Sequence, residues 1–404
     1  MDDVLKYWLT EYHIDGFRFD LSKGFTQRYT TTISAWSAYD ASRIKILSDY
    51  YNFIKSVNPR AIVILEHFAE DREEQVLAQK GFLLWSNQNY SFAQAAMGWI
   101  NGSDFSREFY QQHGFTQPRA LSYMESHDEE RIMYKIKTWG NSYENYNTRQ
   151  LPTAVKRVAM TLPFFFAAPG PKMIWQFEEL GYDYSINTCE NGTINDNCRT
   201  SPKPIRWDYA SDSLRHWLYL QFAHYISWHV NDTMLNIAHY SYSLYYPVKV
   251  IRLDWKDQHM VIVGNFAVNE QTIKLQFPHS GLWLDQKSGR SMYLNDSLVS
   301  LRLLPGEYHV YTDKYVPIGT DTSAVGPEKL KIFPNPPHAY FVVKTIPDSK
   351  LYVYDLYGKL VKTLQTAADY TTVNALDLEP GIYFVKQVSS SGIKQGKVIV
   401  LQAQ

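Results

Sequence analysis

An arginine and an aspartate lie two residues apart near the start of the chain, in the stretch GFRFD that ends at Asp20. Side chains on a β-strand alternate between its two faces, so Arg18 and Asp20 are predicted to share one face and one site. Charge-assisted hydrogen bonds from an arginine favour the ionised carboxylate. Lys23 follows where the strand should end, and parallel α/β folds bind their ligands at that end of a strand. A buried strand with a satisfied ion pair would explain Arg18 and Asp20 but not Lys23.

Two more carboxylates follow predicted strands. Glu66 comes directly after the apolar run 61–65, and the pair His127 and Asp128 follows the run 118–126. Burial against an apolar strand raises the pKa of a glutamic acid, so Glu66 is a candidate general acid. The acidic residues after Glu66 also allow a simpler interpretation, an acidic loop at the start of a helix. A single His-Asp pair is uninformative, but a third acid at the end of a third strand indicates a shared site.

These acids require elements that hold them at one edge of a sheet. Segments with helical spacing of apolar residues alternate with short apolar runs through the first 230 residues, which is typical of a parallel α/β fold. The predicted helices are 2–12, 41–57, 153–162 and 213–229, and the predicted strands include 61–65, 81–85 and the runs before Asp128 and around Ile174.

The pattern changes after residue 230. Short alternating strands separated by turn residues predict an all-β sandwich over 231–315, which we interpret as a packing module without an active site of its own. A polar linker is expected over 316–327, followed by a second β module over 328–404. The predicted domains are thus the α/β part, the sandwich, the linker and the last module.

Composition excludes several classes of function. The net charge of −1 gives no electrostatic basis for binding nucleic acid or an anionic membrane, and no apolar run is long enough to span one. The acidic start at Met1 does not resemble a signal peptide. The 31 Tyr, 20 Phe and 11 Trp suit a carbohydrate-binding protein, although large aromatic cores explain them equally well.

The chain has two cysteines, Cys189 and Cys198, in a polar loop that contains Asn-Gly. In an oxidising compartment they could close a small disulfide ring. Two cysteines without a nearby histidine are too few for a structural zinc site.

The stretch from Gly16 to Asp20, followed by Lys23, resembles the fourth-strand motif of the α-amylase family, glycoside hydrolase family 13. The pair His127 and Asp128 resembles the seventh-strand motif of that family. The resemblance implies a partial (β/α)8 barrel over 1–230 that holds strands four to eight, with strands one to three absent from the chain.

The same resemblance implies the roles of the site residues. Asp20 would be the nucleophile of a retaining glycoside hydrolase that acts on α-glucans, with Glu66 as acid and base and Asp128 stabilising the transition state. Arg18 would orient Asp20, and Lys23 and His127 would bind sugar hydroxyls. A transglycosylase such as a branching enzyme uses the same acids, and a non-catalytic fragment is the third hypothesis.

The resemblance implies no cofactor. Many members have a histidine after the fourth-strand lysine, and this chain has Gly24 there. No calcium ligand is therefore expected from that position, and no metal is predicted.

Three elements of the last module occur in order: Pro-Asn-Pro ending at Pro336, Asp355 followed by Gly358, and Pro-Gly-Ile-Tyr ending at Tyr383. They resemble the C-terminal sorting domain of the type IX secretion system of Bacteroidetes; a carbohydrate-binding sandwich is the alternative. The resemblance implies export to the cell surface or beyond, with the secretion machinery as a partner. Such a compartment also favours a bond between Cys189 and Cys198.

Overall fold

Five short parallel strands form the sheet that carries the charged residues, in the order β1-β2-β3-β4-β7. Each strand pairs in parallel with its neighbour, so their carboxyl ends lie at one edge. This arrangement is a half-barrel. Its strands are β1 (Gly16–Phe19), β2 (Ile62–Leu65), β3 (Leu83–Asn87), β4 (Ala120–Tyr123) and β7 (Lys172–Met173).

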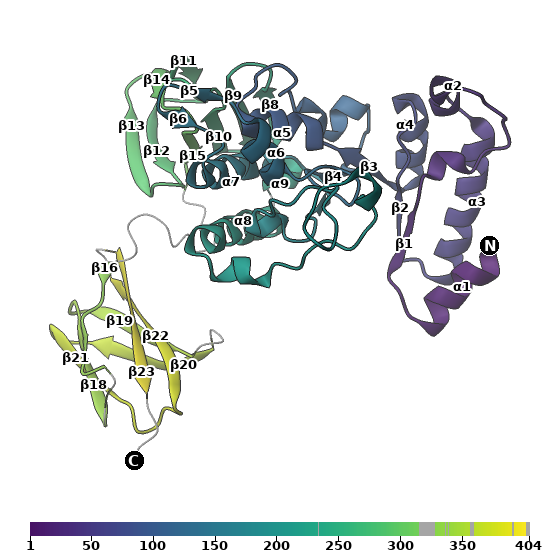
Figure 1. Ribbon diagram of the computed structural model, residues 1–404. Coiled ribbons are helices and arrows are strands. Elements are labelled where there is room, and N and C mark those ends of the chain that lie inside the picture. Colours follow the sequence, from purple (N-terminus) through teal and green to yellow (C-terminus); the bar gives the residue numbers. More distant parts are fainter. Residues whose placement is uncertain are drawn as a thin grey trace. The chain divides into compact units, whose positions relative to one another are not determined.

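Helices cover one face of this sheet. In the described part of the chain the α-helices are α1 (Asp2–Glu11), α2 (Ile33–Ser37), α3 (Ala41–Val57), α4 (Asp71–Lys80), α5 (Asn89–Met97), α6 (Ile132–Trp139), α7 (Leu151–Ala167), α8 (Ser213–Asn231) and the short α9 (Met234–Ile237). In Figure 1, α1, α3 and α4 lie on one side of β1 and β2, where Leu5, Leu47 and Leu77 pack against Val63 and Leu65.

The other face of the sheet carries a different set of side chains. Alternation along the strands sends Ile64, Trp85, Leu121 and Met173 to this face, where they form a small hydrophobic cluster. These residues line a hollow on this face, and Arg18 lines it too. The charged and aromatic residues of the site thus share the face that the helices leave uncovered.

Two predicted boundaries differ from those observed. The helix expected to end at Leu162, before Pro163, continues to Ala167 as α7. Nearly all its side chains from Ala154 onward are buried, and this tertiary packing outweighs the missing backbone donor of proline. The strand expected at 81–85 lies at 83–87 because Gly81, with φ of 109°, instead ends α4.

The β-rich region after α8 has a six-stranded sheet in the order β13-β12-β15-β10-β9-β8 and a two-stranded sheet of β11 and β14. Trp283, Phe277 and Leu275 lie in the core between them. The strands are β8 (His239–Ser243), β9 (Val248–Trp255), β10 (Gln258–Asn265), β11 (Gln271–Gln276), β12 (Gly281–Asp285), β13 (Arg290–Leu294), β14 (Leu298–Leu303) and β15 (Tyr308–Thr312); a small hairpin, β5 (Ser142–Tyr143) and β6 (Tyr146–Asn147), precedes α7.

This β-rich region and the half-barrel share one hydrophobic core. Phe164 of α7 stacks edge-to-face on Phe266, which follows β10, and the buried Arg157 donates to backbone carbonyls on both sides. Residues 1–320 accordingly form one compact unit, and the division expected near residue 230 falls inside it.

Residues 321–404 form the second unit. It has a five-stranded sheet, β16-β23-β22-β19-β20, and a three-stranded sheet, β17-β18-β21, around a core that includes Phe341, Val353 and Val385. Its strands are β16 (Glu328–Lys329), β17 (Ile332–Phe333), β18 (Tyr340–Lys344), β19 (Ser349–Tyr354), β20 (Leu360–Thr366), β21 (Tyr370–Asn374), β22 (Gly381–Ser389) and β23 (Gly392–Val400).

This computed structural model describes residues 1–232, 234–314, 328–335, 337, 339–355, 359–389 and 392–400. The linker expected at 316–327, Pro336 and Gly358 lie outside them. Among the described helices, none combines the length and the apolar composition needed to cross a bilayer.

Candidate active site

Arg18 joins the first two predicted acids. Its Nη1 lies 2.5 Å from Oδ1 of Asp20, and its Nη2 lies 2.8 Å from Oε2 of Glu66. The register of β1 and β2 explains this: Phe19 pairs with Leu65, so Asp20 and Glu66 occupy equivalent positions just past the two strands. A single guanidinium therefore holds two carboxylates at the carboxyl edge of the sheet.

The turn after β1 fixes the position of Glu66. Leu21 adopts a left-handed conformation with φ of 40°, and its backbone N–H donates to Oε2 of Glu66 over 2.9 Å. Ser22 donates its backbone N–H to the carbonyl of Glu66 over 2.7 Å. The apolar surroundings expected for the Glu66 carboxyl are therefore not what the structure shows, because Arg18 and a backbone amide contact the same oxygen.

Asp20 and Glu66 differ in exposure to solvent. The side chain of Asp20 is 76% exposed, whereas that of Glu66 is 9% exposed. The hydrogen bond from Arg18 lowers the pKa of Asp20 below its usual value, so this carboxylate is ionised at neutral pH. An exposed, ionised carboxylate beside a buried one can serve nucleophilic catalysis.

An aromatic row connects Arg18 to the third predicted acid. The guanidinium of Arg18 lies 4.2 Å from the ring centre of Trp85, in the middle of β3, which is a cation–π distance. Trp85 packs on Tyr123 at 5.0 Å and on His127 at 6.1 Å, and His127 lies 5.8 Å from Trp175. The row runs across the carboxyl ends of three strands.

Tyr123 lies among the predicted acids. Burial raises the pKa of its hydroxyl, and the negative charges of Glu129, Glu66 and Asp128 raise it further. The carboxylates at the ends of β2 and β4 thus act electrostatically on the same group, which is consistent with one shared site.

His127 and Asp128 face a cavity of about 350 Å³. Nε2 of His127 lies 3.4 Å from Oδ2 of Asp128, and both side chains are about half exposed. Trp175 lines this cavity and also a hollow of about 600 Å³ that contains Arg18 and Trp85. His127 lines both as well, so it connects the two halves of the site.

A disulfide-bonded insert borders this cavity. Cys189 and Cys198 are bonded, with Cα atoms 5.0 Å apart. The next residue, Arg199, donates to the carbonyl of Asp128 over 2.5 Å and lies 3.7 Å from its carboxylate. The insert thus places a cation against the third acid.

Lys23 does not join the other predicted site residues. Its side chain is buried, and its ammonium donates to Oγ of Ser37 and to the carbonyl of Phe68 over 3.2 and 3.3 Å while packing over Trp36. The left-handed residue Leu21 precedes this buried position, and the role of Lys23 in binding a sugar stays a prediction.

The sequence analysis missed the aromatic residues of the row and Arg199. Trp85 could have been found, because it ends a predicted strand on the same alternating face as Arg18. Arg199 had no local signal, because its contact with Asp128 joins residues 71 positions apart.

Asp71, Glu74 and His113 form a group of possible metal ligands. Arg107 already binds both carboxylate oxygens of Asp71, over 2.8 and 3.1 Å. This ion pair occupies the group, so it does not offer a free metal site.

Comparisons with known proteins support these observations. Residues 331–401 match the secretion system C-terminal sorting domain. Neopullulanase 2 of Thermoactinomyces vulgaris is 24% identical over 331 residues, which cover 75% of this chain. The chain spans about half of that relative, 46% of its length.

Solved structures of α-amylases share the fold. An Anoxybacillus α-amylase matches with a TM-score of 0.53 and 16% identity over 77% of this chain and 61% of its own. AmyP in complex with maltose matches with a TM-score of 0.55 and 14% identity over 77% and 66%. The residues before the sorting-domain match are thus similar in sequence to a neopullulanase and in fold to an α-amylase and to AmyP.

Proposed function

We propose that the chain is a retaining glycoside hydrolase that acts on α-glucans, with Asp20 as nucleophile and Glu66 as acid and base. The observation that carries this proposal is the fork of Arg18, by which we mean its two terminal nitrogens, Nη1 on Asp20 and Nη2 on Glu66. Retaining enzymes need two carboxyl groups roughly 5 Å apart on either side of the scissile bond. Two groups bound to one guanidinium are within reach of that spacing.

In this mechanism, an oxygen of Asp20 attacks the anomeric carbon and forms a glycosyl-enzyme, while Glu66 gives its proton to the departing glycosidic oxygen. Glu66 then takes a proton from water, whose oxygen attacks the anomeric carbon and releases Asp20. Ionisation of Asp20 suits it to attack. Glu66 lies beside Asp20 on the same guanidinium, which places it to exchange a proton with the departing oxygen.

The remaining residues would bind and orient the sugar. Asp128 would stabilise the positive charge that develops on the ring, and His127 would bind hydroxyl groups from the cavity that both residues line. Arg18 would hold Asp20 ionised. Lys23, beneath the loop, would act on the sugar only indirectly, by holding the turn after β1.

The substrate class rests on the relatives. One curated relative is named a neopullulanase, and AmyP was solved with maltose and, as a variant, with maltotriose. We infer an α-glucan oligosaccharide or polysaccharide as the substrate of this chain. The sorting domain implies export, and we propose the type IX secretion machinery as its partner and the cell surface or the medium as its destination.

The test is hydrolysis of maltooligosaccharides and amylose by the full chain, followed by reducing-end release. Asp20→Asn should reduce turnover on the order of 10⁶-fold, as for loss of another covalent nucleophile. Asp15→Asn, at an exposed aspartate before β1, is the isosteric control and should leave turnover unchanged.

Activity retained in Asp20→Asn would refute the assignment of the nucleophile. An inactive, folded wild-type chain would refute the enzyme proposal and favour a non-catalytic product. New α-1,6 links in amylose without a matching rise in reducing ends would identify a branching transglycosylase instead of a hydrolase.

A further inference from the structure

Two histidines and an aspartate from separate segments meet at one end of the six-stranded sheet. His259 lies in β10, Asp313 directly follows β15, and His279 lies in the loop between β11 and β12. The register of β10 and β15 pairs Met260 with Thr312, so His259 and Asp313 continue the same ladder. The backbone N–H of His259 donates to Oδ1 of Asp313 over 2.8 Å.

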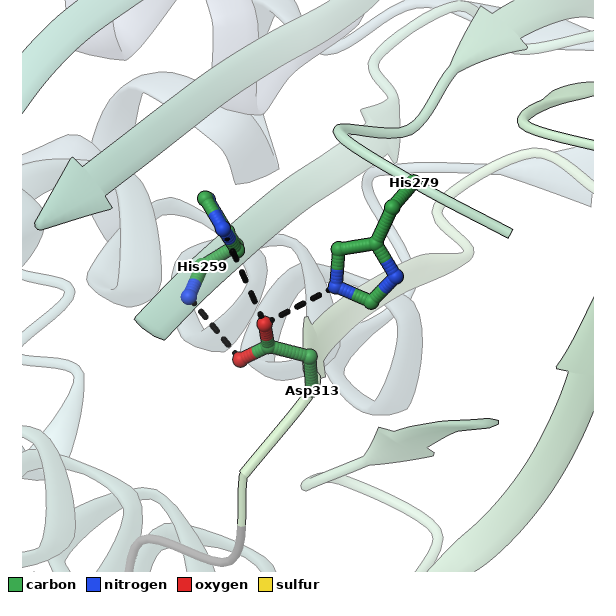
Figure 2. Close-up of side chains that lie close together, drawn as sticks. All are labelled: His259, His279 and Asp313. Carbon is green, nitrogen blue, oxygen red and sulfur yellow. Dashed lines mark hydrogen bonds and ion pairs between the residues drawn. The ribbon is translucent and has the colours of Figure 1, made fainter. Parts of the chain in front are cut away.

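The second carboxylate oxygen of Asp313 is where the two imidazole rings converge. Its Oδ2 lies 3.0 Å from Nε2 of His279 and 4.0 Å from Nε2 of His259 (Figure 2). The side chain of Asp313 is 7% exposed, and those of His259 and His279 are 22% and 43% exposed. The three groups therefore form a half-buried corner that is open to solvent on the side of His279.

The other nitrogen of each ring is already held. Nδ1 of His259 lies 2.7 Å from a carboxylate oxygen of Asp254, and Nδ1 of His279 lies 2.6 Å from the carbonyl of Ser280. In both rings Nδ1 thus faces an oxygen, while Nε2 faces the carboxylate of Asp313. Metal-binding histidines are oriented in this way by carboxylates and backbone carbonyls.

Two imidazole nitrogens and a carboxylate oxygen gathered at one point are ligand types that a divalent transition metal binds. Zn²⁺ binds histidine nitrogen and carboxylate oxygen at about 2.0–2.2 Å, so tetrahedral ligand atoms lie roughly 3.3 Å apart. The observed separations of 3.0 and 4.0 Å bracket this value. All three ligand atoms lie within 4.8 Å of one another, so small rotations of the rings would complete the site.

We propose that His259, His279 and Asp313 bind one divalent transition-metal ion, with Zn²⁺ as the preferred occupant. Imidazole and carboxylate ligands favour zinc over calcium and magnesium, which bind through oxygen alone. The protein supplies three ligands, and water completes the fourth position on the exposed side of His279. The ion ties the loop before β12 to the ends of β10 and β15, so it acts as a structural clip on the β-rich region.

Another histidine in the same region shows what distinguishes this corner. His309 has carboxylates on both ring nitrogens, Asp285 at 3.0 Å and Glu307 at 3.1 Å. These two carboxylates do not gather with a second histidine into a group of three close ligand atoms among the described residues. In the described part of the β-rich region, His259 and His279 instead direct one nitrogen each at a shared carboxylate.

The experiment uses the untagged full chain after removal of metals with a chelator. Zinc bound per chain is measured after dialysis against micromolar ZnCl₂, and thermal unfolding is followed by tryptophan fluorescence with and without zinc. All 11 Trp lie at or before residue 283, so the fluorescence reports only the first unit. The variants are His279→Gln and His259→Gln, and His216→Gln, at an exposed histidine of α8, is the matched control.

We expect one zinc per chain in the wild type and in His216→Gln, with a rise in Tm on the order of 5 °C at saturating zinc. The affinity should fall at least about 10-fold in His279→Gln and in His259→Gln, and the zinc-dependent rise in Tm should disappear. Co²⁺ in place of zinc should give a visible absorption band that both variants lose.

Three results would overturn the proposal. The first is that the wild type binds no zinc. The second is that zinc binds equally well to both histidine variants, because the ion then lies elsewhere. The third is that the three groups form an ion pair only. Asp313 raises the pKa of His279. If a protonated His279 only pairs with Asp313, His279→Gln lowers the Tm relative to the wild type by the same amount with and without zinc.

Discussion

The fork of Arg18 allows one side chain to be tested against two carboxylates that differ in burial. The change is Arg18→Met, combined in two double-mutant cycles with Asp20→Asn and Glu66→Gln. The cycles isolate the two pairwise energies, because the packing of Arg18 on Trp85 is lost in both and cancels.

The structure gives the expected sizes. Glu66 is 9% exposed and Arg18 is 25% exposed, so their pair is largely desolvated. Breaking a fully buried pair costs about 3–5 kcal/mol, and the partial exposure of Arg18 lowers our expectation to about 2 kcal/mol of coupling. Asp20 is 76% exposed, and a pair this exposed is worth under about 1 kcal/mol despite its shorter distance.

The assay is urea unfolding followed by tryptophan fluorescence, with free energies taken from the midpoints and slopes of the four proteins in each cycle. The coupling of Arg18 with Glu66 should exceed that with Asp20 by about 1 kcal/mol, which is above the usual error of such cycles. Equal couplings, or a larger coupling with Asp20, would show that distance rather than burial sets the strength of this fork.

Two further predictions concern the elements around the site. Gly16→Ala should lower the free energy of unfolding, measured in urea, by about 3 kcal/mol, because its Cβ would lie 1.9 Å from the carbonyl oxygen of Ile62. The control Gly24→Ala has 3.9 Å to the nearest atom and should change this free energy by under about 0.5 kcal/mol. Similar losses in the two variants would contradict the close contact of β1 and β2. Burial raises the pKa of Glu74 from 4.5 to about 8. The carboxyl group therefore binds its proton more tightly in the native state than in the unfolded chain, and the stability that this proton gives is lost as the pH rises from 4.5 to 8. Glu74→Gln should therefore reduce the fall in Tm between pH 5 and pH 8, and an unchanged fall would show that Glu74 does not titrate in this range.

Local patterns predicted the elements that carry their own signals. The helix expected at 41–57 is α3, because Asp40 caps its first turn with hydrogen bonds to the N–H groups of Ser42 and Arg43. The alternation of side chains along β1 placed Arg18 and Asp20 together, and their ion pair confirms that expectation. Positions set by one or two neighbouring elements could thus be predicted.

Features that depend on distant segments could not. The course of α7 past Pro163 depends on burial by surrounding elements, and the contact of Arg199 with Asp128 depends on a disulfide-bonded insert. The position of Lys23 depends on the left-handed turn at Leu21. A leucine rarely adopts this conformation, so the sequence does not indicate the turn. Each of these features is decided by tertiary packing.

Arg157 adds a constraint on how the chain can fold as it is synthesised. This fully buried guanidinium has no carboxylate beside it among the described residues; it donates to the carbonyls of Ala95, Ala96, Phe266 and Ala267. The last two partners are made 109 and 110 residues after Arg157. Until then the charge must stay hydrated, so α7 cannot settle into its buried position. The half-barrel can therefore complete its packing only after residues 266 and 267, which follow β10, have been synthesised. We expect the half-barrel and the β-rich region to fold in one cooperative step and not in the order of their synthesis.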